Sequence, residues 1–374
     1  MRSMQGMRAI DLFSGAGGFA LGLRRAGWKI ACANDHDELA SQTFRANFPE
    51  ATFFRSGISQ LSADSILECT QTRVGELECL IGGPPCQSFS YNNHHRNATD
   101  ERSKLFKDYL RIVRGTLPKI IIMENVPGLQ TISDGRVLDH IKRELTSMGY
   151  RVTSKVLRAE LYGTPQSRRR LIIAGSRLGD AESLIPTPSH DTHFVDVRAA
   201  ISDLPIVANG CSIIKQPYGK PAESLFQKNM REGSSELTHH VCTQLGPKNL
   251  ARIKSVKEGG NWRQIPRDLL PAGMQRARLT DHTKRYGRLG WAGLASTILT
   301  KCDPHWGAYI HPNQDRTITV REAARLQGFP DSFSFPEVGI TNMYQQIGNA
   351  VPIPLAQALG AMSASHLNSQ QSTG

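Results

Sequence analysis

A cysteine follows two prolines at the end of a short apolar segment. The segment Leu77–Ile81 has the composition of a buried strand, and the Gly-Gly-Pro-Pro sequence after it turns the chain out of the sheet. This turn presents Cys86 at the carboxyl end of a strand, where open α/β sheets place their chemistry. A structural cysteine is more typical inside the apolar segment, as Cys79 is. Taken alone, the pattern leaves two roles open for Cys86, a nucleophile and a turn residue.

A glycine-rich turn follows the first apolar segment of the chain. Residues 8–13 have the pattern of a strand and lead directly into Ser14-Gly15-Ala16-Gly17-Gly18. Glycines at a strand-to-helix turn let the backbone approach a ligand closely. A second strand, residues 29–33, ends near Asp35, and a carboxylate there can accept hydrogen bonds from both hydroxyls of a ribose. The two features predict a nucleoside cofactor, without separating a nicotinamide dinucleotide from S-adenosylmethionine.

The elements that would hold these residues alternate between strands and helices in the first half of the chain. Such alternation predicts an α/β fold with a doubly wound, mostly parallel sheet covered by helices. The expected helices span residues 17–26 and 139–148, and the expected strands span residues 8–13, 29–33, 77–81, 119–123, 151–157 and 169–174. The last two strands are expected to pair and close the sheet.

The second half of the chain has a different character. From about residue 185 to residue 311, prolines, glycines and short polar segments replace the alternation, which predicts a smaller, irregular domain. Thr319 and Glu322 form a capping-box pattern that predicts a short helix ending near Gly328. An apolar helix is expected over residues 353–362.

The composition favours a polyanionic partner. The 374-residue chain has a formal net charge of +12 at pH 7 and a pI near 9.5. Seventeen Lys/Arg and ten Asp/Glu lie between Asp191 and Ile310, so the irregular region carries much of the excess. Nucleic acid would bind to a surface with this positive charge. The alternative is that the charge only keeps the protein soluble.

The composition also indicates where the protein is located and whether it binds a metal. Seven cysteines without paired spacing favour reduced thiols and a cytoplasmic location. No apolar stretch of the sequence approaches the roughly 18 residues of a membrane span, and no signal-peptide pattern opens it. The histidines and cysteines lack metal-ligand spacing, so no metal is expected.

Six segments resemble, in the family's order, the motifs of cytosine-5 DNA methyltransferases of the bacterial, restriction-modification type. They are residues 11–18 (Asp-Leu-Phe-Ser-Gly-Ala-Gly-Gly), 83–90 (Gly-Pro-Pro-Cys-Gln-Ser-Phe-Ser), 123–126 (Met-Glu-Asn-Val), 166–170 (Gln-Ser-Arg-Arg-Arg), 316–330 and 346–352 (Gln-Ile-Gly-Asn-Ala-Val-Pro). The resemblance spans nearly the whole chain. It implies the Rossmann-like fold of S-adenosylmethionine-dependent methyltransferases, with a smaller irregular target-recognition domain.

The resemblance also implies a domain plan. A catalytic, cofactor-binding domain would occupy residues 1–184 and the target-recognition domain residues 185–315. Residues 316–362 would return to complete the catalytic domain, and residues 363–374 would form a disordered tail.

The implied reaction is methyl transfer from S-adenosylmethionine to C5 of a cytosine flipped out of a specific double-stranded DNA sequence. C5 is a poor nucleophile until a thiolate adds to C6 and breaks the aromaticity of the ring. The resemblance assigns this addition to Cys86 and assistance at N3 to Glu124. It assigns contacts with cytosine O2 and a phosphate to Arg168 and Arg170, with Arg170 the stronger candidate for the base.

The remaining site residues follow from the resemblance. The implied cofactor-binding residues are Phe13, Ser14, Gly15, Ala16, Gly17, Gly18, Asp35, His36, Ile58, Pro85, Asn349, Ala350 and Val351. The implied DNA-binding residues are Ser88, Ser90, Arg102, Arg263 and Arg285. Arginine suits both guanine O6/N7 and phosphate oxygens. The expected partner is double-stranded DNA, and a restriction endonuclease would be a genetic partner of a chain that acts as a monomer in the cytoplasm, associated with the nucleoid.

Three positions depart from the family pattern. Residues 91–97 contain no glycine, although the loop after the catalytic motif usually does. Gly57 stands where an aspartate usually contacts the adenine amino group, and His36 stands where tryptophan is usual. A weaker affinity for the cofactor is the expected consequence.

Three other functions fit these residues less well. The tRNA-methylating branch of the family carries a Cys-Phe-Thr tripeptide, and no cysteine here precedes phenylalanine. A non-catalytic DNA-binding relative would not need Cys86, Glu124 and Arg170 together. A dehydrogenase built on the glycine turn would leave residues 166–170 unexplained.

Overall fold

The structure is a computed structural model that describes residues 6–85, 101–336 and 338–371, with only the backbone described for residues 101–104 and 371. The chain divides into two compact units. The first unit comprises Met1–Tyr162, Arg169–Pro188 and Val351–Gly374, and the second comprises Gly163–Arg168 and Ser189–Ala350.

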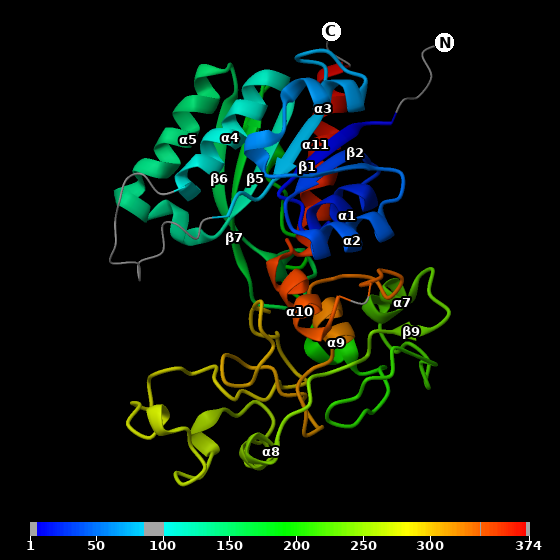
Figure 1. Ribbon diagram of the computed structural model, residues 1–374, viewed down its shortest axis with the longest axis vertical. Helices are drawn as coiled ribbons and strands as arrows, with labels where there is room; N and C mark the ends of the chain where they lie inside the picture. The colour runs from blue at the N-terminus through cyan, green and yellow to red at the C-terminus, as the bar shows by residue number, and fades with distance from the viewer. Residues whose placement is uncertain (1–5, 86–100, 337, 372–374) are drawn as a thin grey trace. The chain divides into compact units, whose positions relative to one another are not determined.

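A seven-stranded sheet forms the centre of the first unit, in the order β3-β2-β1-β4-β5-β7-β6 (Figure 1). The strands are β1 Arg8–Leu12, β2 Lys29–Asp35, β3 Thr52–Arg55, β4 Cys79–Gly82, β5 Ile120–Asn125, β6 Arg151–Arg158 and β7 Arg169–Ser176. The first five are parallel, whereas β7 pairs antiparallel with both β5 and β6. The mostly parallel sheet and its closing strand pair, both predicted from the sequence, are confirmed.

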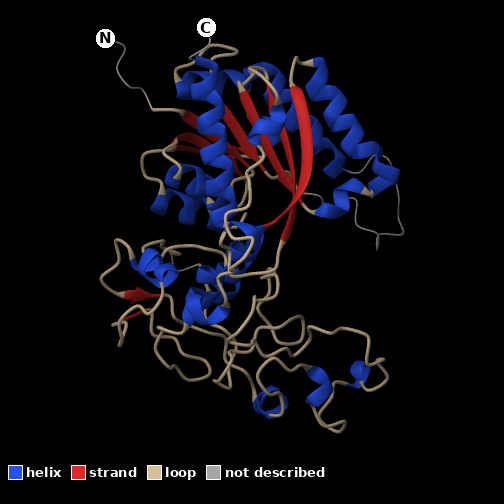
Figure 2. Cartoon of the chain, turned by 180° about the vertical axis from the view of Figure 1, so that it is seen from behind, coloured by secondary structure: helices blue, strands red, loops and turns tan. Residues whose placement is uncertain are grey.

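Helices cover both faces of this sheet (Figures 1 and 2). They are α1 Gly18–Arg25, α2 Glu38–Asn47, α3 Ala63–Thr70, α4 Glu101–Thr116, α5 Arg136–Ser147 and α11 Ile353–Gln371. An apolar cluster joins α3, α4 and α5 to one face of the strands. On the other face α1 packs closely against α11, because a Cβ on Gly22 would lie 2.3 Å from Ala356 Cβ.

The strand sequences explain the depth of this core. Ile120–Met123 of β5 is buried on both faces, as an uninterrupted apolar run in a parallel sheet predicts. Because β1, β2, β4 and β5 are parallel neighbours, their carboxyl ends lie at one edge of the sheet. The amino end of antiparallel β7 lies at that same edge.

The second unit contains short elements joined by long irregular segments, as predicted. They are α6 Val197–Ile201, β8 Lys215–Gln216, α7 Leu225–Arg231, β9 Leu237–Thr238, α8 Pro247–Lys254, α9 Val320–Leu326 and α10 Ile340–Asn349. The 3-10 helices of the chain are η1 Ile58–Gln60, η3 Pro127–Gln130, η4 Ile132–Gly135, η5 Ala159–Tyr162, η6 Ala181–Leu184, η7 Trp262–Gln264 and η8 Ala272–Met274. A small apolar core gathers Leu245, Ile253, Val256, Trp262, Ile265, Met274, Tyr286 and Ile310.

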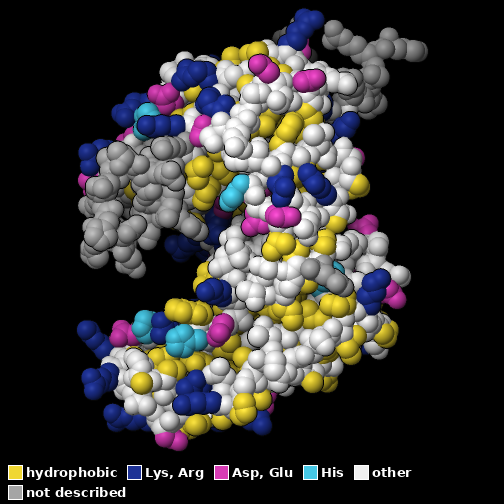
Figure 3. Space-filling view, viewed as in Figure 1, with side chains coloured by type: hydrophobic (Ala, Val, Ile, Leu, Met, Phe, Trp, Pro, Cys, Tyr) yellow, Lys and Arg dark blue, Asp and Glu magenta, His cyan; other side chains and the backbone are white. Residues whose placement is uncertain are grey.

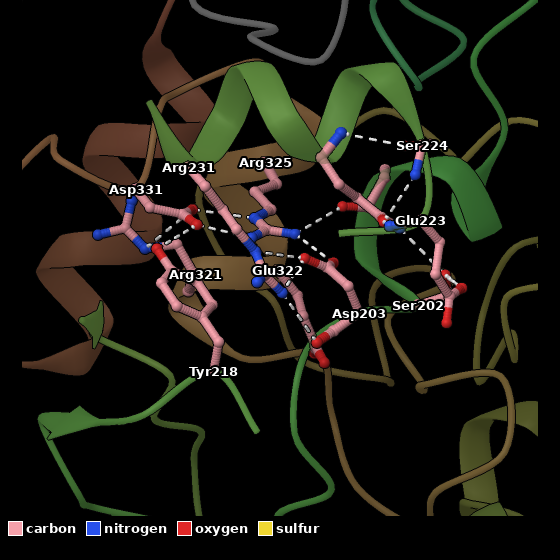
Figure 4. Close-up of polar contacts among 12 residues, drawn as sticks. Ser202, Asp203, Tyr218, Glu223, Ser224, Arg231, Arg321, Glu322, Arg325 and Asp331 are labelled. Carbon is pink, nitrogen blue, oxygen red and sulfur yellow. Dashed lines mark hydrogen bonds and ion pairs between the residues drawn. The ribbon is translucent and has the colours of Figure 1, made fainter. Parts of the chain in front are cut away.

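Buried ion pairs fix α9 in the second unit (Figure 4). The Arg325 guanidinium lies 2.5 Å from Asp203 Oδ1 and 2.6 Å from Asp331 Oδ2, and all three side chains are 0% exposed. Arg231 donates to Asp203 Oδ2 over 2.8 Å, and Tyr218 donates to Asp331 Oδ2 over 2.9 Å. Burial alone would raise the pKa of Asp331, but the Arg325 guanidinium lowers it below its usual range.

The predicted capping box at the start of α9 is confirmed. Thr319 Oγ1 accepts from the Glu322 backbone N–H over 3.1 Å, and Glu322 Oε2 accepts from the Thr319 backbone N–H over 2.7 Å. Both oxygens of Glu322 also lie 2.7 Å from the guanidinium nitrogens of Arg316. Sequence therefore located this helix start, although the ion pair beneath it was not predicted.

The residues after 315 divide between the units differently from our prediction. Residues 316–350 pack within the second unit, and the chain returns to the first unit at Val351. The buried pairs of Arg316 and Arg325 account for the difference, because their partners all belong to the second unit.

The predicted disordered tail is wrong for residues 363–371. Helix α11 continues to Gln371, and Ser363, His366 and Leu367 are buried. The polar composition of these residues gave no apolar pattern that predicts a helix. One side of the helix nevertheless packs through small and hydrogen-bonded side chains, such as His366, whose Nε2 lies 2.8 Å from Ser176 Oγ. Among the described residues, no helix combines the length and apolar character needed to cross a membrane.

Candidate active site

The turn after β1 adopts a backbone that favours glycine. The φ angles of Gly15 and Gly17 are 52° and 92°, and that of Phe13 is 58°. A Cβ on Gly17 would lie 2.7 Å from Phe48 Cε2, so both conformation and packing require glycine there. A Cβ on Gly15 would meet no heavy atom of the described residues within 4 Å, so the turn is open on that side. Ser14, Ala16, Gly17 and Gly18 are buried.

Asp11, at the end of β1, fixes the helix that follows the turn. Its Oδ2 accepts from the Ala20 backbone N–H over 3.2 Å, and its side chain is buried. Burial raises the pKa of Asp11 well above its usual range, and the nearby Asp35 adds to this. Asp11 was not among the predicted site residues, although a polar residue ending an apolar strand is a signal that would have indicated it.

The carboxylate of Asp35 ties the end of β2 to the glycine turn. Its Oδ2 accepts from the Gly15 backbone N–H over 2.8 Å, and its Oδ1 accepts from the Asp37 N–H over 2.9 Å. The side chain remains 12% exposed, and His36 Nδ1 lies 3.3 Å from Oδ1. The His36 side chain itself is 81% exposed. The sequence predicted the glycine turn and Asp35 as parts of one site, and the two are in direct contact.

The segment after β3 differs from the other strand ends. Ile58 is 3% exposed and packs in the apolar core, and its predicted contact with the cofactor stays a prediction. Its carbonyl accepts from the Arg111 guanidinium over 2.7 Å. Asn34 Nδ2 donates to the carbonyls of Phe54 and Ser56 over 2.8 and 2.9 Å, which ties β2 to β3 beside Gly57.

The ends of β4 and β5 bring Glu124 against the start of the Cys86 segment. A Cβ on Gly83 would lie 3.2 Å from Glu124 Oε2, so glycine leaves room for the carboxylate. Asn125 Nδ2 donates to the Pro84 carbonyl over 2.8 Å, which holds the chain just before Pro85 and Cys86. Pro85 is exposed. Cys86 itself, with Ser88 and Ser90, lies outside the described residues, as does the side chain of Arg102.

Arg170 completes this edge of the sheet. Its guanidinium Nε forms an ion pair with Glu124 Oε1, and the two side chains are 14% and 12% exposed. Because β7 is antiparallel to β5, the amino end of β7 brings Arg170 beside the carboxyl end of β5. The predicted acid, Glu124, therefore has the Arg170 guanidinium beside it.

Arg168 makes its contacts within the second unit. It belongs to the second unit, is 2% exposed, and donates to the carbonyls of Ile298 and Gly348 over 2.8 Å each. Gln166 lies beside it, accepting from the Ile298 backbone N–H over 2.9 Å and donating to Gln327 Oε1 over 2.7 Å. The Arg168 guanidinium thus holds backbone segments of the second unit together, and its predicted contact with cytosine O2 or a phosphate stays a prediction.

Residues 349–351 follow the Gly348 carbonyl that Arg168 contacts. Asn349 is the exposed last residue of α10, Gln327 Nε2 donates to the Ala350 carbonyl over 3.1 Å, and Val351 is buried in the first unit. Gln327 was not predicted as a site residue, since nothing in its local sequence indicates a partner at residue 166.

Gly348 is expected to be irreplaceable in this network. A Cβ there would lie 2.4 Å from the carbonyl C and O of Leu299 and 2.6 Å from the Thr300 nitrogen. These are backbone atoms, so Gly348→Ala is expected to lower the free energy of unfolding by about 1–3 kcal/mol. Gly273→Ala is the matched control, since its Cβ would meet no described atom within 4 Å. Urea unfolding midpoints that are equal for the two variants would contradict the prediction.

The predicted DNA-binding arginines of the second unit are both at its surface. Arg263 is exposed and donates to the Leu279 carbonyl, and Arg285 is half-buried. Figure 3 shows Lys and Arg side chains distributed over the second unit, with His side chains among them. Among the described residues, no group of three His, Cys, Asp or Glu side chains is arranged to hold a metal ion.

Comparisons with known proteins give one family over most of the chain. The family model for C-5 cytosine-specific DNA methylases matches residues 7–363. The Type II methyltransferase M1.HphI of Haemophilus parahaemolyticus is 35% identical over 94% of this chain and 84% of its own length. The Type II methyltransferase M.DdeI of Desulfomicrobium norvegicum is 34% identical over 94% of this chain and 87% of its own length.

Longer relatives and a solved structure agree with this match. DNA (cytosine-5)-methyltransferase 4 of Arabidopsis thaliana is 32% identical over 95% of this chain, which spans 28% of that relative's length. A solved structure of a prophage-encoded E. coli protein, described as a candidate DNA modification methyltransferase, gives a TM-score of 0.74 at 25% identity. It covers 97% of this chain and 99% of its own chain.

Proposed function

Because the chain belongs to the C-5 cytosine-specific DNA methylase family, we propose that it transfers a methyl group from S-adenosylmethionine to C5 of a cytosine in a specific double-stranded DNA sequence. One observation carries this function. A single edge of the sheet holds the Asp35–Gly15 contact and, beside the strand end that leads to Cys86, the Glu124–Arg170 pair. A nucleoside site and an acid beside a nucleophile are the two parts that the reaction needs.

The glycine turn and Asp35 fit the nucleoside part of the cofactor. The backbone is open at Gly15, and the half-buried Phe13 ring would contact the adenine. Each oxygen of Asp35 accepts one backbone N–H, and a carboxylate oxygen has a second lone pair for a ribose hydroxyl. When bound, S-adenosylmethionine supplies a methyl group made electrophilic by a sulfonium sulfur.

The residues of the chain would then activate the base. The Cys86 thiolate adds to C6 of the flipped cytosine, which makes C5 enamine-like and raises the electron density at N3. Glu124 donates a hydrogen bond to N3, and Arg170 would contact O2 while orienting the Glu124 carboxyl group. After methyl transfer, loss of the C5 proton to a base expels the thiolate and restores the ring. Gly83 and Asn125 hold the segment before Cys86 against Glu124.

Asp35→Asn is expected to weaken cofactor binding. Asparagine can still accept from Gly15 but removes the charged acceptor for the ribose hydroxyls, and hydrogen bonds to charged groups contribute about 1.5–3 kcal/mol. The dissociation constant of S-adenosylmethionine is therefore expected to rise about tenfold or more, as measured by calorimetry. Glu38→Gln is the control, because it removes a nearby carboxylate that pairs only at the surface with Arg55. A change below twofold in Asp35→Asn would contradict the proposed ribose contact.

A 5-fluorocytosine trap tests the covalent step. Fluorine at C5 cannot leave as a proton does, so the thiolate cannot be expelled after methyl transfer. Duplex DNA synthesised with 5-fluorocytosine at every cytosine is expected to give a complex with the chain that survives denaturing electrophoresis, only when S-adenosylmethionine is present. Cys86→Ser should give none. Methylation of ordinary DNA without a trapped complex would exclude the covalent route, and methyl transfer to RNA alone would replace DNA as the substrate.

Three further expectations stay predictions. They are that the chain is a monomer, that it is cytoplasmic and associates with the nucleoid through DNA, and that a restriction endonuclease is its genetic partner. Sedimentation of the chain with and without a DNA duplex would test the first of them. One subunit acting on one base requires no second copy, so a mass near 41 kDa is expected without DNA.

A further inference from the structure

The arginines of the second unit differ in whether their guanidinium groups are already engaged. Arg288 is buried and donates to the carbonyls of Val256, Ile253 and His311 over 2.7, 2.9 and 2.9 Å. Arg252 donates to the Leu269 carbonyl over 2.7 Å. Guanidinium groups bound in this way hold the fold and are not available to read a base.

Arg285 is engaged differently. Its guanidinium carbon lies 5.4 Å from the centroid of the Trp306 ring. Trp306 is 52% exposed, a large fraction for tryptophan, and the His305 ring packs edge-on against it at 5.1 Å. Among the described residues, Arg285 forms no ion pair, so its donors remain available beside an aromatic face.

Two backbone segments are built together to present this pair. Residues 282–289 and 303–310 are joined by bonds from Tyr286 N to the Pro304 carbonyl (2.5 Å) and from Gly287 N to the Gly307 carbonyl (3.3 Å). A Cβ on Gly287 would lie 2.5 Å from Ala308 Cβ, so the segments touch at this glycine. The buried Tyr286 anchors them in the apolar core beneath.

The turn that carries Arg285 is strained on both sides. His282 and Tyr286 have φ angles of 51° and 48°, in the left-handed region that residues other than glycine rarely adopt. Such strain persists only where the surrounding structure enforces it, and it concentrates at functional sites. The Arg285 carbonyl accepts from the Trp262 N–H over 3.1 Å, which fixes the backbone of the turn from the core side.

We propose that Arg285 reads a guanine of the target DNA sequence and that Trp306 is the positioning residue that orients its guanidinium. An arginine held near an aromatic face has fewer side-chain orientations to choose from, and guanine O6 and N7 accept its planar fork bidentately. Holding the side chain before DNA arrives also lowers the entropy that is lost on binding. This inference rests on the proposed DNA methylation, because it assigns the sequence specificity of that reaction.

The first test maps the sequence preference of the full chain. Purified protein and S-adenosylmethionine are incubated with a library of randomised duplexes, and methylated cytosines are read with their flanking bases. Arg285→Ala is expected to lower the preference for guanine at one position about tenfold or more, and Arg285→Lys to lower it as well because lysine lacks the fork. Lys248→Ala, which removes an exposed positive charge from the same unit, is expected to leave base preference unchanged.

Trp306 has its own prediction in the same assay. Trp306→Ala is expected to reduce the preference at the same position, and Trp306→Phe to retain most of it because the aromatic face remains. A purely structural role would instead lower the melting temperature and the rate for all sequences equally. An unchanged preference in Arg285→Ala and Arg285→Lys, with only the overall rate reduced, would overturn the proposal.

If Arg285→Ala has no activity, binding to a chemically substituted duplex tests the same contact. Binding is measured with 7-deazaguanine, which lacks the N7 acceptor, at each guanine of the mapped sequence in turn. At one position the substitution should weaken binding of the wild-type chain about fivefold or more and have little further effect on Arg285→Lys. No position with this coupling would overturn the proposal. A wild-type chain that methylates no cytosine in the library would overturn both this inference and the proposed function.

Discussion

Glu124→Gln is expected to lower the rate of methyl transfer by about 10²- to 10⁴-fold, the range for loss of a positioned general acid. Glutamine has nearly the shape of glutamate and can still occupy the space that Gly83 leaves open. Its amide N–H can donate a hydrogen bond to cytosine N3 but cannot transfer a proton to it, and the ion pair with Arg170 is lost. The rate is measured in a single turnover at saturating DNA and S-adenosylmethionine, so that weaker binding does not contribute.

The control for this variant is Glu144→Gln. Glu144 also pairs with an arginine, Arg114, over 2.9 Å, but on helices α5 and α4 and with the two side chains 34% and 58% exposed. Its replacement removes the same charge from the same unit and is expected to leave the rate unchanged. If Glu124→Gln retained a rate within threefold of the wild-type chain, an acid at N3 would have to come from another group. DNA binding by Glu124→Gln is expected to persist, which separates the chemical role from a binding role.

Asp331→Asn is expected to have the largest effect on stability. The substitution leaves the fully buried Arg325 with one carboxylate in place of two, and Arg321, whose Nε lies 3.9 Å from Asp331, with none at that distance. Removing one partner of a buried ion pair typically costs about 3–5 kcal/mol. Tyr218 would also lose its charged acceptor.

Tryptophan fluorescence during urea unfolding can measure this loss. Trp262, Trp291 and Trp306 all lie in the second unit, so the signal reports mainly on that unit. Lys220→Ala is the control, because it breaks a pair with Glu223 in which both side chains are about half exposed, at 45% and 55%. Its expected effect is about 0.5 kcal/mol or less. Equal midpoints for Asp331→Asn and Lys220→Ala would show that the buried network does not stabilise the second unit.

The sequence predicted the parts of the fold that depend on local pattern. Uninterrupted apolar runs such as Ile120–Met123 marked buried strands, and Thr319 with Glu322 marked a helix start through contacts three residues apart. The glycine turn and Asp35 were predicted as one site because two adjacent parallel strands must end together. Their contact, from Gly15 N–H to Asp35 Oδ2, confirms that geometry.

The sequence did not predict contacts that join distant segments. Three consecutive arginines look alike locally, but Arg168 binds carbonyls 130 and 180 residues further along the chain, whereas Arg170 meets Glu124 across a strand pair. The resemblance separated the two only as candidates for the base, and their different contacts are seen only in the tertiary structure. The polar residues after Ser363 likewise gave no sign that α11 continues, because its buried side depends on partners such as Ser176.

The roles proposed for Glu124, Arg170 and Asp35 all assume that Cys86 is the nucleophile. Their positions at one edge of the sheet would support that role. The most direct measurement is bisulfite sequencing of plasmid DNA from cells that express this chain, beside cells that express Cys86→Ala. We predict 5-methylcytosine in one short recurring sequence for the wild-type chain and none for Cys86→Ala at equal soluble protein. Methylation that persists in Cys86→Ala, or its absence from cells containing soluble wild-type protein, would contradict the account.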